Sequence, residues 1–169
     1  MPSLYLNFHQ AFKGVLKMII KALIPVRSGS ERVKNKNIKP FAGSSLLEIK
    51  IKQMLRIKAL DGIVVNSNCD EMLEIAHKLG VETVKRDEYF ALSLTPNEEI
   101  YENYAQNIDC DTIVFADCTN PLIKDETIIR AIDTYHSLGS NYDSLATQVM
   151  QNFLYITRVK VQIMMKIIS

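Results

Sequence analysis

Residues 21–58 read KALIPVRSGSERVKNKNIKPFAGSSLLEIKIKQMLRIK and contain the pattern that decides the fold. The stretch begins with a short apolar run, Lys21 to Val26, which is typical of a buried strand and ends in a polar turn that contains glycine. From Ser45 to Lys58 the apolar residues recur at helical spacing, namely Leu46, Leu47, Ile49, Ile51, Met54 and Leu55. The sequence therefore predicts a strand, a polar loop and a helix in succession.

The alternation of strand and helix continues along most of the chain. Further strands are predicted at 62–65, 81–84, 112–116 and 144–149. Further helices are predicted at 70–79, in a segment that ends at residue 107, and at 125–138. Strands that alternate with helices of about ten to fifteen residues indicate an α/β, Rossmann-like fold with a mostly parallel sheet covered on both faces. Ligands bind beyond the carboxyl ends of such strands, so we expect the chemistry in the loops after Val26, Val65 and Phe115.

Length and composition are those of a soluble protein with one domain. The 169 residues are 47% hydrophobic and 23% charged with a net charge of +1, and they lack the basic surplus that nucleic acid binding requires. No apolar run approaches the length of a membrane span, so we expect neither a nucleic acid partner nor a membrane. Three cysteines without ligand-like spacing predict neither a disulfide framework nor a zinc site, and they fit a cytoplasmic protein.

The two ends of the chain differ in composition from its body. Residues 1–17 and 151–169 contain basic residues and no acidic residue, and Met18 directly precedes the first apolar run. We therefore expect residues 1–17 to be an N-terminal extension, with an amphipathic helix as the alternative. Residues 18–150 would then form the domain, and residues 151–169 a divergent C-terminal tail.

The polar loop after the first predicted strand is dense in groups that bind anions. It contains the hydroxyl and amide donors Ser28 and Ser30, Gly29, which permits close backbone approach, and the cations Arg27, Arg32 and Lys36. A triphosphate would fit such a loop, although the residues match neither the P-loop nor the dinucleotide fingerprint. A solvated basic loop is the alternative.

The loop and its flanks also resemble a known family. ALIPVRSGSERVKNKNIKPFAG resembles the signature R-x-G-S-[KR]-R-x-P-x-K-N of the acylneuraminate cytidylyltransferases, and weaker likeness continues through VVNSNCDEMLEIAHKLGVETVKRDEYF and DTIVFADCTNPLI. The resemblance covers roughly residues 19 to 150. It implies a sheet of the nucleotide-diphospho-sugar transferase type, transfer of CMP from CTP to a nonulosonic (sialic-type) acid with release of pyrophosphate, a magnesium cofactor and a homodimer.

The resemblance also implies roles for single residues of the loop. Arg27 and Lys36 would be the catalytic cations that neutralise the CTP phosphates. The remaining nucleotide-binding positions of the loop would be Ser28, Gly29, Ser30, Arg32 and Asn37.

Further positions lie later in the chain. Arg86 falls where the family has an arginine near the nucleotide and the sugar, and a surface arginine paired with Asp87 and Glu88 is the alternative. Thr119 and Asn120 fall in a turn that faces the acceptor in the family.

Several positions depart from the family pattern. Glu31 replaces a basic residue, Lys34 replaces a proline, and Asn68 stands where the family commonly has Asp. Asp117 stands where relatives tend to have Gln, and its carboxylate could bind Mg²⁺, a hard cation that prefers oxygen ligands. A carboxylate that caps the following turn is the alternative for Asp117.

The largest departure concerns the end of the chain. Family members continue through a dimer-forming segment and an acidic D-x-D-like motif that binds the catalytic magnesium, whereas residues 151–169 contain no carboxylate. We therefore expect a shifted reading frame or a premature truncation, with the dimer segment missing. The alternatives in function are a truncated relative that binds CTP with little or no turnover, and a nucleotidyltransferase for another sugar such as 3-deoxy-octulosonate.

Overall fold

The computed structural model describes residues 17–29, 33–138, 142 and 144–146. Its elements follow in the order β1 (Ile20–Pro25), α2 (Leu46–Leu55), β2 (Gly62–Ser67), α3 (Asp70–Lys78), β3 (Glu82–Lys85), the 3₁₀ helix η1 (Glu88–Ala91), α4 (Asn97–Asn107), β4 (Thr112–Phe115) and α5 (Asp125–Ser137). The predicted α/β alternation is confirmed, and η1 is an addition that the sequence pattern did not predict.

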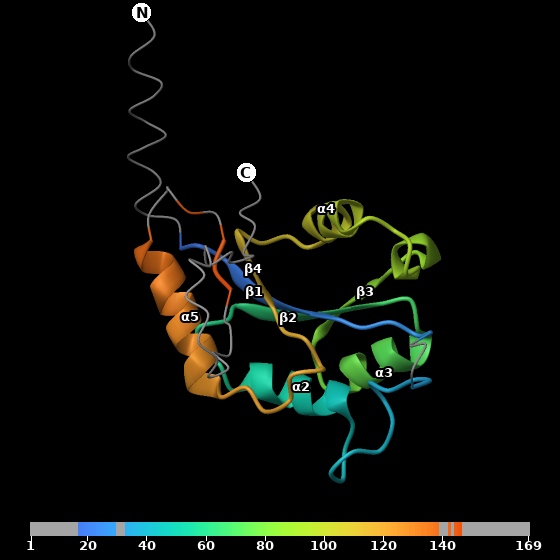
Figure 1. Cartoon of the computed structure of the whole chain (residues 1–169). Helices are drawn as coiled ribbons and strands as arrows, with labels where there is room; N and C mark the ends of the chain where they lie inside the picture. The colour runs from blue at the N-terminus through green and yellow to red at the C-terminus, as the bar shows by residue number, and fades with distance from the viewer. Residues whose placement is uncertain (1–16, 30–32, 139–141, 143, 147–169) are drawn as a thin grey trace, which may run out of the picture.

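The four described strands form one parallel sheet in the order β3-β2-β1-β4 (Figure 1). Strand β1 lies inside the sheet, where Leu23 pairs with Val64 on one side and with Phe115 on the other. Three consecutive residues of β1, Ala22 to Ile24, are fully buried because helices cover both faces of the sheet.

Side chains of β1 alternate between two hydrophobic clusters. Ala22 and Ile24 pack with α2, α3 and α5 in the larger cluster. Leu23 points to the opposite face, where Tyr104 and Ile108 close a smaller cluster under α4. Figure 1 shows the same arrangement, with α2 and α3 on one side of the sheet and α4 on the other.

Helix α2 begins at a capping arrangement and buries one stripe of its surface. The Ser45 hydroxyl accepts a hydrogen bond from the backbone N–H of Glu48 at 3.2 Å, which satisfies one of the open donors of the first turn. The buried face of α2 consists of Leu47, Lys50, Ile51, Gln53 and Met54. Two polar residues are therefore buried in this stripe, and their partners lie in the functional site described below.

Backbone hydrogen bonds between neighbouring chain segments continue for one residue past the ends of the strands. Val26 donates to the Asn66 carbonyl at 3.0 Å, and Ala116 donates to the Leu23 carbonyl at 2.8 Å. Arg86 donates in the same way to the Ser67 carbonyl at 2.8 Å. The loops that follow these strands therefore start from fixed positions along one edge of the sheet.

Some predicted segments lie outside the described residues. Of the strand predicted at 144–149, residues 144–146 form no strand, and the rest is not described. Residues 1–16 of the predicted extension and the whole predicted tail, 151–169, are likewise outside the described residues. Within the part of the chain that is described, no helix is both long enough and apolar enough to cross a membrane.

Candidate functional site

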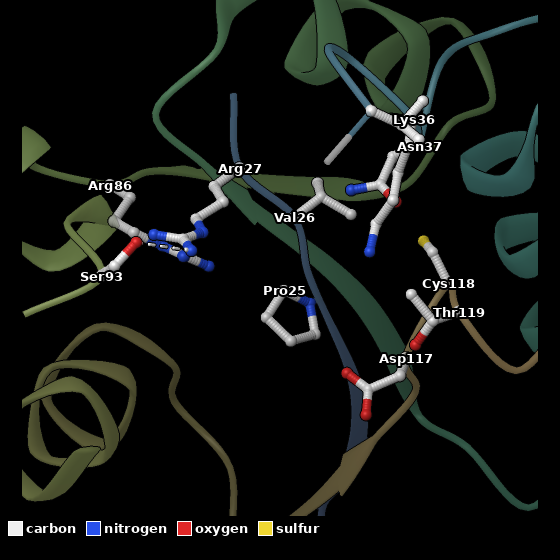
Figure 2. Close-up of a pocket in the computed structure, with 11 residues that line it drawn as sticks. Pro25, Val26, Arg27, Lys36, Asn37, Arg86, Ser93, Asp117, Cys118 and Thr119 are labelled. Atoms are coloured by element: carbon white, nitrogen blue, oxygen red, sulfur yellow. Dashed lines mark hydrogen bonds between the residues drawn. The ribbon is translucent and has the colours of Figure 1, made fainter. Parts of the chain in front are cut away.

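A cavity of about 640 Å³ opens at the carboxyl ends of β1 and β4, where the parallel sheet predicts a ligand site (Figure 2). Its walls come from the loops after β1, β3 and β4 and consist of Pro25, Val26, Arg27, Val33, Lys36, Asn37, Arg86, Ser93, Asp117, Cys118 and Thr119. The cavity therefore brings together Arg27, Lys36, Asn37, Arg86, Asp117 and Thr119 from the predicted set.

Arg27 is held against the segment that follows β3. Its guanidinium donates hydrogen bonds to the Ala91 carbonyl and to the Ser93 hydroxyl, the latter at 3.2 Å. Figure 2 shows the Arg27 and Arg86 guanidinium groups next to each other at one side of the cavity. Two neighbouring cations at a cavity wall favour an anionic ligand.

Arg86 is a buried cation, with only 5% of its surface exposed. It donates from Nε to the side-chain oxygen of Asn66 and from Nη2 to the Asn66 carbonyl at 3.1 Å, and it lies over the Tyr104 ring at 5.3 Å. Burial lowers its pKa, and the positive charge of Arg27 lowers it further. Among the described residues, no carboxylate forms an ion pair with Arg86.

The alternative of a surface arginine paired with its sequence neighbours is therefore wrong. Asp87 instead caps η1, because its carboxylate accepts a hydrogen bond from the Tyr89 N–H at 2.8 Å. Glu88 accepts a hydrogen bond from Asn68 at 2.9 Å. Sequence proximity to two acids is misleading here because β3 ends at Lys85, and the chain turns into η1 while Arg86 points inward to β2.

Lys36 and Asn37 line the cavity on the side away from the two arginines (Figure 2). The Asn37 side chain is 6% exposed, and its oxygen is a buried acceptor that has no hydrogen-bond partner among the described residues. Buried acceptors without a partner are uncommon in folded proteins, and this oxygen has almost no accessible surface, so it does not itself face the cavity. The Asn37 carbonyl accepts from Leu47 N–H at 2.9 Å, which ties this part of the loop to α2.

The middle of the loop is described only in part. Ser30 and Arg32 lie outside the described residues. Gly29 has a φ of +79°, which glycine adopts without the steric cost that a side chain would bring. Ser28 does not line the cavity, and its N–H and hydroxyl are both bound by Asn68, at 3.0 and 2.8 Å.

The loop after β4 forms the remaining wall. Asp117 is exposed and lies where this cavity meets a second one of about 440 Å³, since Asp117 and Pro25 line both. Cys118 is buried, and burial raises the pKa of its thiol to about 12, so the thiol is neutral at pH 7. Asn120 lies outside the cavity wall, but its carbonyl accepts a hydrogen bond that fixes the loop.

That hydrogen bond comes from Lys50, a residue that the sequence motifs did not predict to belong to the site. The Lys50 side chain is 1% exposed, and its ammonium donates to the Asn120 carbonyl and to the Gln53 side-chain oxygen, both at 2.8 Å. Burial lowers the pKa of Lys50. A signal was present in the sequence, because Lys50 occupies the i+3 position from Leu47, on the same helix face as the apolar residues Ile51 and Met54.

The chain is similar in sequence to proteins named as cytidylyltransferases or CMP-sugar synthases. A pseudaminic acid cytidylyltransferase from Campylobacter jejuni subsp. jejuni serotype O:2 is 26% identical over 132 residues, and the match covers 75% of this chain and 57% of that protein. A CMP-N,N'-diacetyllegionaminic acid synthase from Legionella pneumophila is 26% identical over 135 residues, with 76% and 58% covered. The chain thus spans a little over half the length of these relatives.

A solved structure of a CMP:2-keto-3-deoxy-manno-octonic acid synthetase complexed with CTP has the same fold. Its TM-score is 0.63 at 11% identity, over 72% of this chain and 49% of that chain, so this likeness supports the fold alone.

The cytidylyltransferase family model matches residues 21–163, which include every described element from β1 to α5 except Ile20, the first residue of β1. The match continues past residue 150, where the resemblance in sequence motifs ends, into a stretch outside the described residues. Because the match takes in most of the chain, the protein belongs to the cytidylyltransferase family.

Proposed function

We propose that this chain binds CTP in the 640 Å³ cavity and transfers CMP from it to a nonulosonic acid. The observation that carries the proposal is the pair formed by Arg27 and buried Arg86, which line one cavity without a carboxylate partner among the described residues. A buried cation of this kind is best satisfied by an anionic ligand, and the triphosphate of CTP is such a ligand.

In the proposed reaction the anomeric hydroxyl oxygen of the sugar forms a bond to the α-phosphorus of CTP. The bond between that phosphorus and the bridging oxygen breaks, pyrophosphate leaves with the electron pair, and the hydroxyl proton passes to solvent. Arg27, Arg86 and Lys36 would hold the phosphate oxygens and offset the charge that develops on them. The sugar supplies the nucleophile, so the chain needs no nucleophilic side chain.

Asp117 fits a role in holding Mg²⁺. Its carboxylate is exposed at the cavity and has no hydrogen-bond or ion-pair partner among the described residues. Mg²⁺ is commonly bound by one or two carboxylates together with substrate phosphates and water, so a single carboxylate is compatible with the ion. When bound there, Mg²⁺ would supply charge neutralisation at the phosphates.

The names of the pseudaminic and legionaminic relatives support a nonulosonic acid as the acceptor. A sequence relative named 3-deoxy-manno-octulosonate cytidylyltransferase keeps 3-deoxy-octulosonate as an alternative acceptor. The cytoplasm is the proposed location, because Cys69, Cys110 and Cys118 are free thiols, as a reducing compartment would keep them.

A second candidate is a chain that binds CTP with little or no turnover. Asp117 is the one carboxylate among the described wall residues, and no group of three or more metal-ligating side chains occurs in the described part of the chain. A single carboxylate favours this candidate, since metal stabilisation of the transition state is worth several kcal/mol.

Calorimetric titration of CTP tests the binding proposal. Arg27→Ala and Lys36→Ala should each weaken CTP binding by about 1.5 to 3 kcal/mol, or roughly ten- to hundredfold, through loss of a charge-assisted hydrogen bond. Lys39→Ala is the matched control, because Lys39 is an exposed lysine of the same loop and lies outside the cavity wall. If both cavity variants bind CTP as the parent does, the assignment of this cavity to the triphosphate is wrong.

Pyrophosphate release separates the candidates in function. With CTP and Mg²⁺, the transferase should release pyrophosphate faster with a nonulosonic acid than with 3-deoxy-octulosonate. Tight CTP binding without release for any acceptor would favour the second candidate.

A further inference from the structure

The side chain of Asn68 connects two loops that border the cavity. Its oxygen accepts a hydrogen bond from the Ser28 N–H at 3.0 Å. Its NH₂ group donates to the Ser28 hydroxyl at 2.8 Å and to the Glu88 carboxylate at 2.9 Å. Asn68 is 7% exposed, Glu88 is an exposed residue, and both N–H donors of the Asn68 amide are used.

These contacts hold the 3₁₀ helix η1 at both of its ends. Glu88 is the first residue of η1 and is bound through Asn68 to Ser28. Ala91 is the last residue of η1, and its carbonyl accepts a hydrogen bond from Arg27. Because η1 is a single turn of four residues, a displacement at its Glu88 end also moves the Ala91 carbonyl, which is the partner of the Arg27 guanidinium.

The backbone of Asn68 is itself anchored. Its carbonyl accepts a hydrogen bond from the Lys85 ammonium at 2.9 Å, and the same ammonium forms an ion pair with Asp70 at the start of α3. The amide of Asn68 is therefore presented from the end of β2 at a fixed place, between the loop after β1 and the segment after β3.

We propose that Asn68 is a positioning residue that sets the orientation of Arg27 through η1, and that the residue must be an amide here because one of its partners is Glu88. An aspartate at position 68 could still accept from the Ser28 N–H, but it has no N–H to offer to the carboxylate. Two carboxylate oxygens would then face each other at hydrogen-bond distance, where both cannot remain ionised at little cost. The effect on nucleotide binding rests on the proposed function, whereas the coupling between positions 68 and 88 does not.

The test uses Asn68→Asp, Glu88→Gln and the double variant in the full chain, with calorimetric titration of CTP. Asn68→Asp should weaken CTP binding about tenfold at pH 8, the size expected for one charge-assisted contact. This loss relative to the parent should shrink toward pH 5, since protonation of one carboxyl restores a donor. Glu88→Gln should bind CTP within about threefold of the parent, because a glutamine oxygen still accepts from Asn68.

The double variant decides whether Glu88 carries the effect. In it a glutamine donates to an aspartate, so the hydrogen bond is reversed but kept, and CTP affinity should return to within about threefold of Glu88→Gln alone. Glu71→Gln is the control for loss of an exposed carboxylate nearby. A double variant as weak as Asn68→Asp, or an Asn68→Asp variant equal to the parent at every pH, would overturn the inference.

A second measurement needs no nucleotide. Urea unfolding of the four proteins should give a double-mutant cycle in which Glu88→Gln restores the stability that Asn68→Asp removes. Coupling in this cycle together with a parent that does not bind CTP would refute the proposed function and leave the 68–88 contact standing. Absence of coupling in this cycle would refute the inference whether or not CTP binds.

Discussion

Substitution of the buried lysine of α2 tests how the β4–α5 loop is held. Lys50→Met keeps most of the volume of the side chain but removes the ammonium that donates to Asn120 and Gln53. The Gln53 oxygen would lose this donor in the interior, at a cost of about 1 to 3 kcal/mol for an unsatisfied buried acceptor. Water can rehydrate the Asn120 carbonyl more easily, because Asn120 is an exposed residue.

The expected result is a lower free energy of unfolding for Lys50→Met by about 1 to 3 kcal/mol, since release of the buried charge offsets only part of the lost contacts. For a chain of this length, that loss lowers Tm by about 2 to 12 °C. Lys52→Met is the matched control, because Lys52 is an exposed lysine on the same helix. Thermal unfolding followed by circular dichroism measures both variants.

The pH dependence of stability gives a second check on Lys50. Burial lowers its pKa below the ordinary value of 10.5, so between these two values the unfolded chain binds more protons than the folded chain. The parent should therefore gain stability relative to Lys50→Met as pH rises toward 10.5. A Lys50→Met variant that is as stable as the parent, with no change in this slope, would refute the reasoning.

Two further predictions concern charged groups near the same loops. The parent should bind CTP more tightly with Mg²⁺ than with EDTA, and Asp117→Asn should remove this difference. An equal effect of Mg²⁺ on both proteins would contradict the metal assignment. A hydrogen bond from Arg56 lowers the pKa of Asp125, so the stability from this pair is present above the ordinary value of 3.8 and is lost as pH falls through the lowered pKa. Arg56→Met should therefore flatten the acid limb of stability in urea unfolding between pH 5 and pH 2, and an unchanged limb would contradict this.

Local patterns in the sequence predicted most of the described fold. The apolar spacing from Leu47 to Met54 placed α2, and short apolar runs placed β2 and β4 within two residues of their observed ends. The single turn η1 was missed because its four residues are too few to show a helical period, and because it depends on the Asp87 cap. Hydrophobic periodicity reports which residues are buried and says little about a short capped turn.

Part of the cavity wall was predictable from the first loop, and less of it from the rest of the sequence. Arg27 and Lys36 stand in a local motif, and both line the cavity. The burial of Arg86 depends on a contact with Asn66, which is 20 residues away in sequence and belongs to another strand. No spacing rule connects two such residues, because parallel register, rather than sequence distance, brings the ends of β2 and β3 together.

The different supports of the two cavity walls have an evolutionary consequence. The wall with Arg27 and Arg86 is tied through η1, Asn66 and Asn68, so most single substitutions there disturb several partners at once. The wall with Asp117 and Thr119 belongs to a loop that is held from behind by Lys50 and Gln53 of α2. Exposed positions of that loop other than Asp117 can change without loss of those anchors or of the proposed metal ligand, so a lineage can vary them while it conserves the arginine wall.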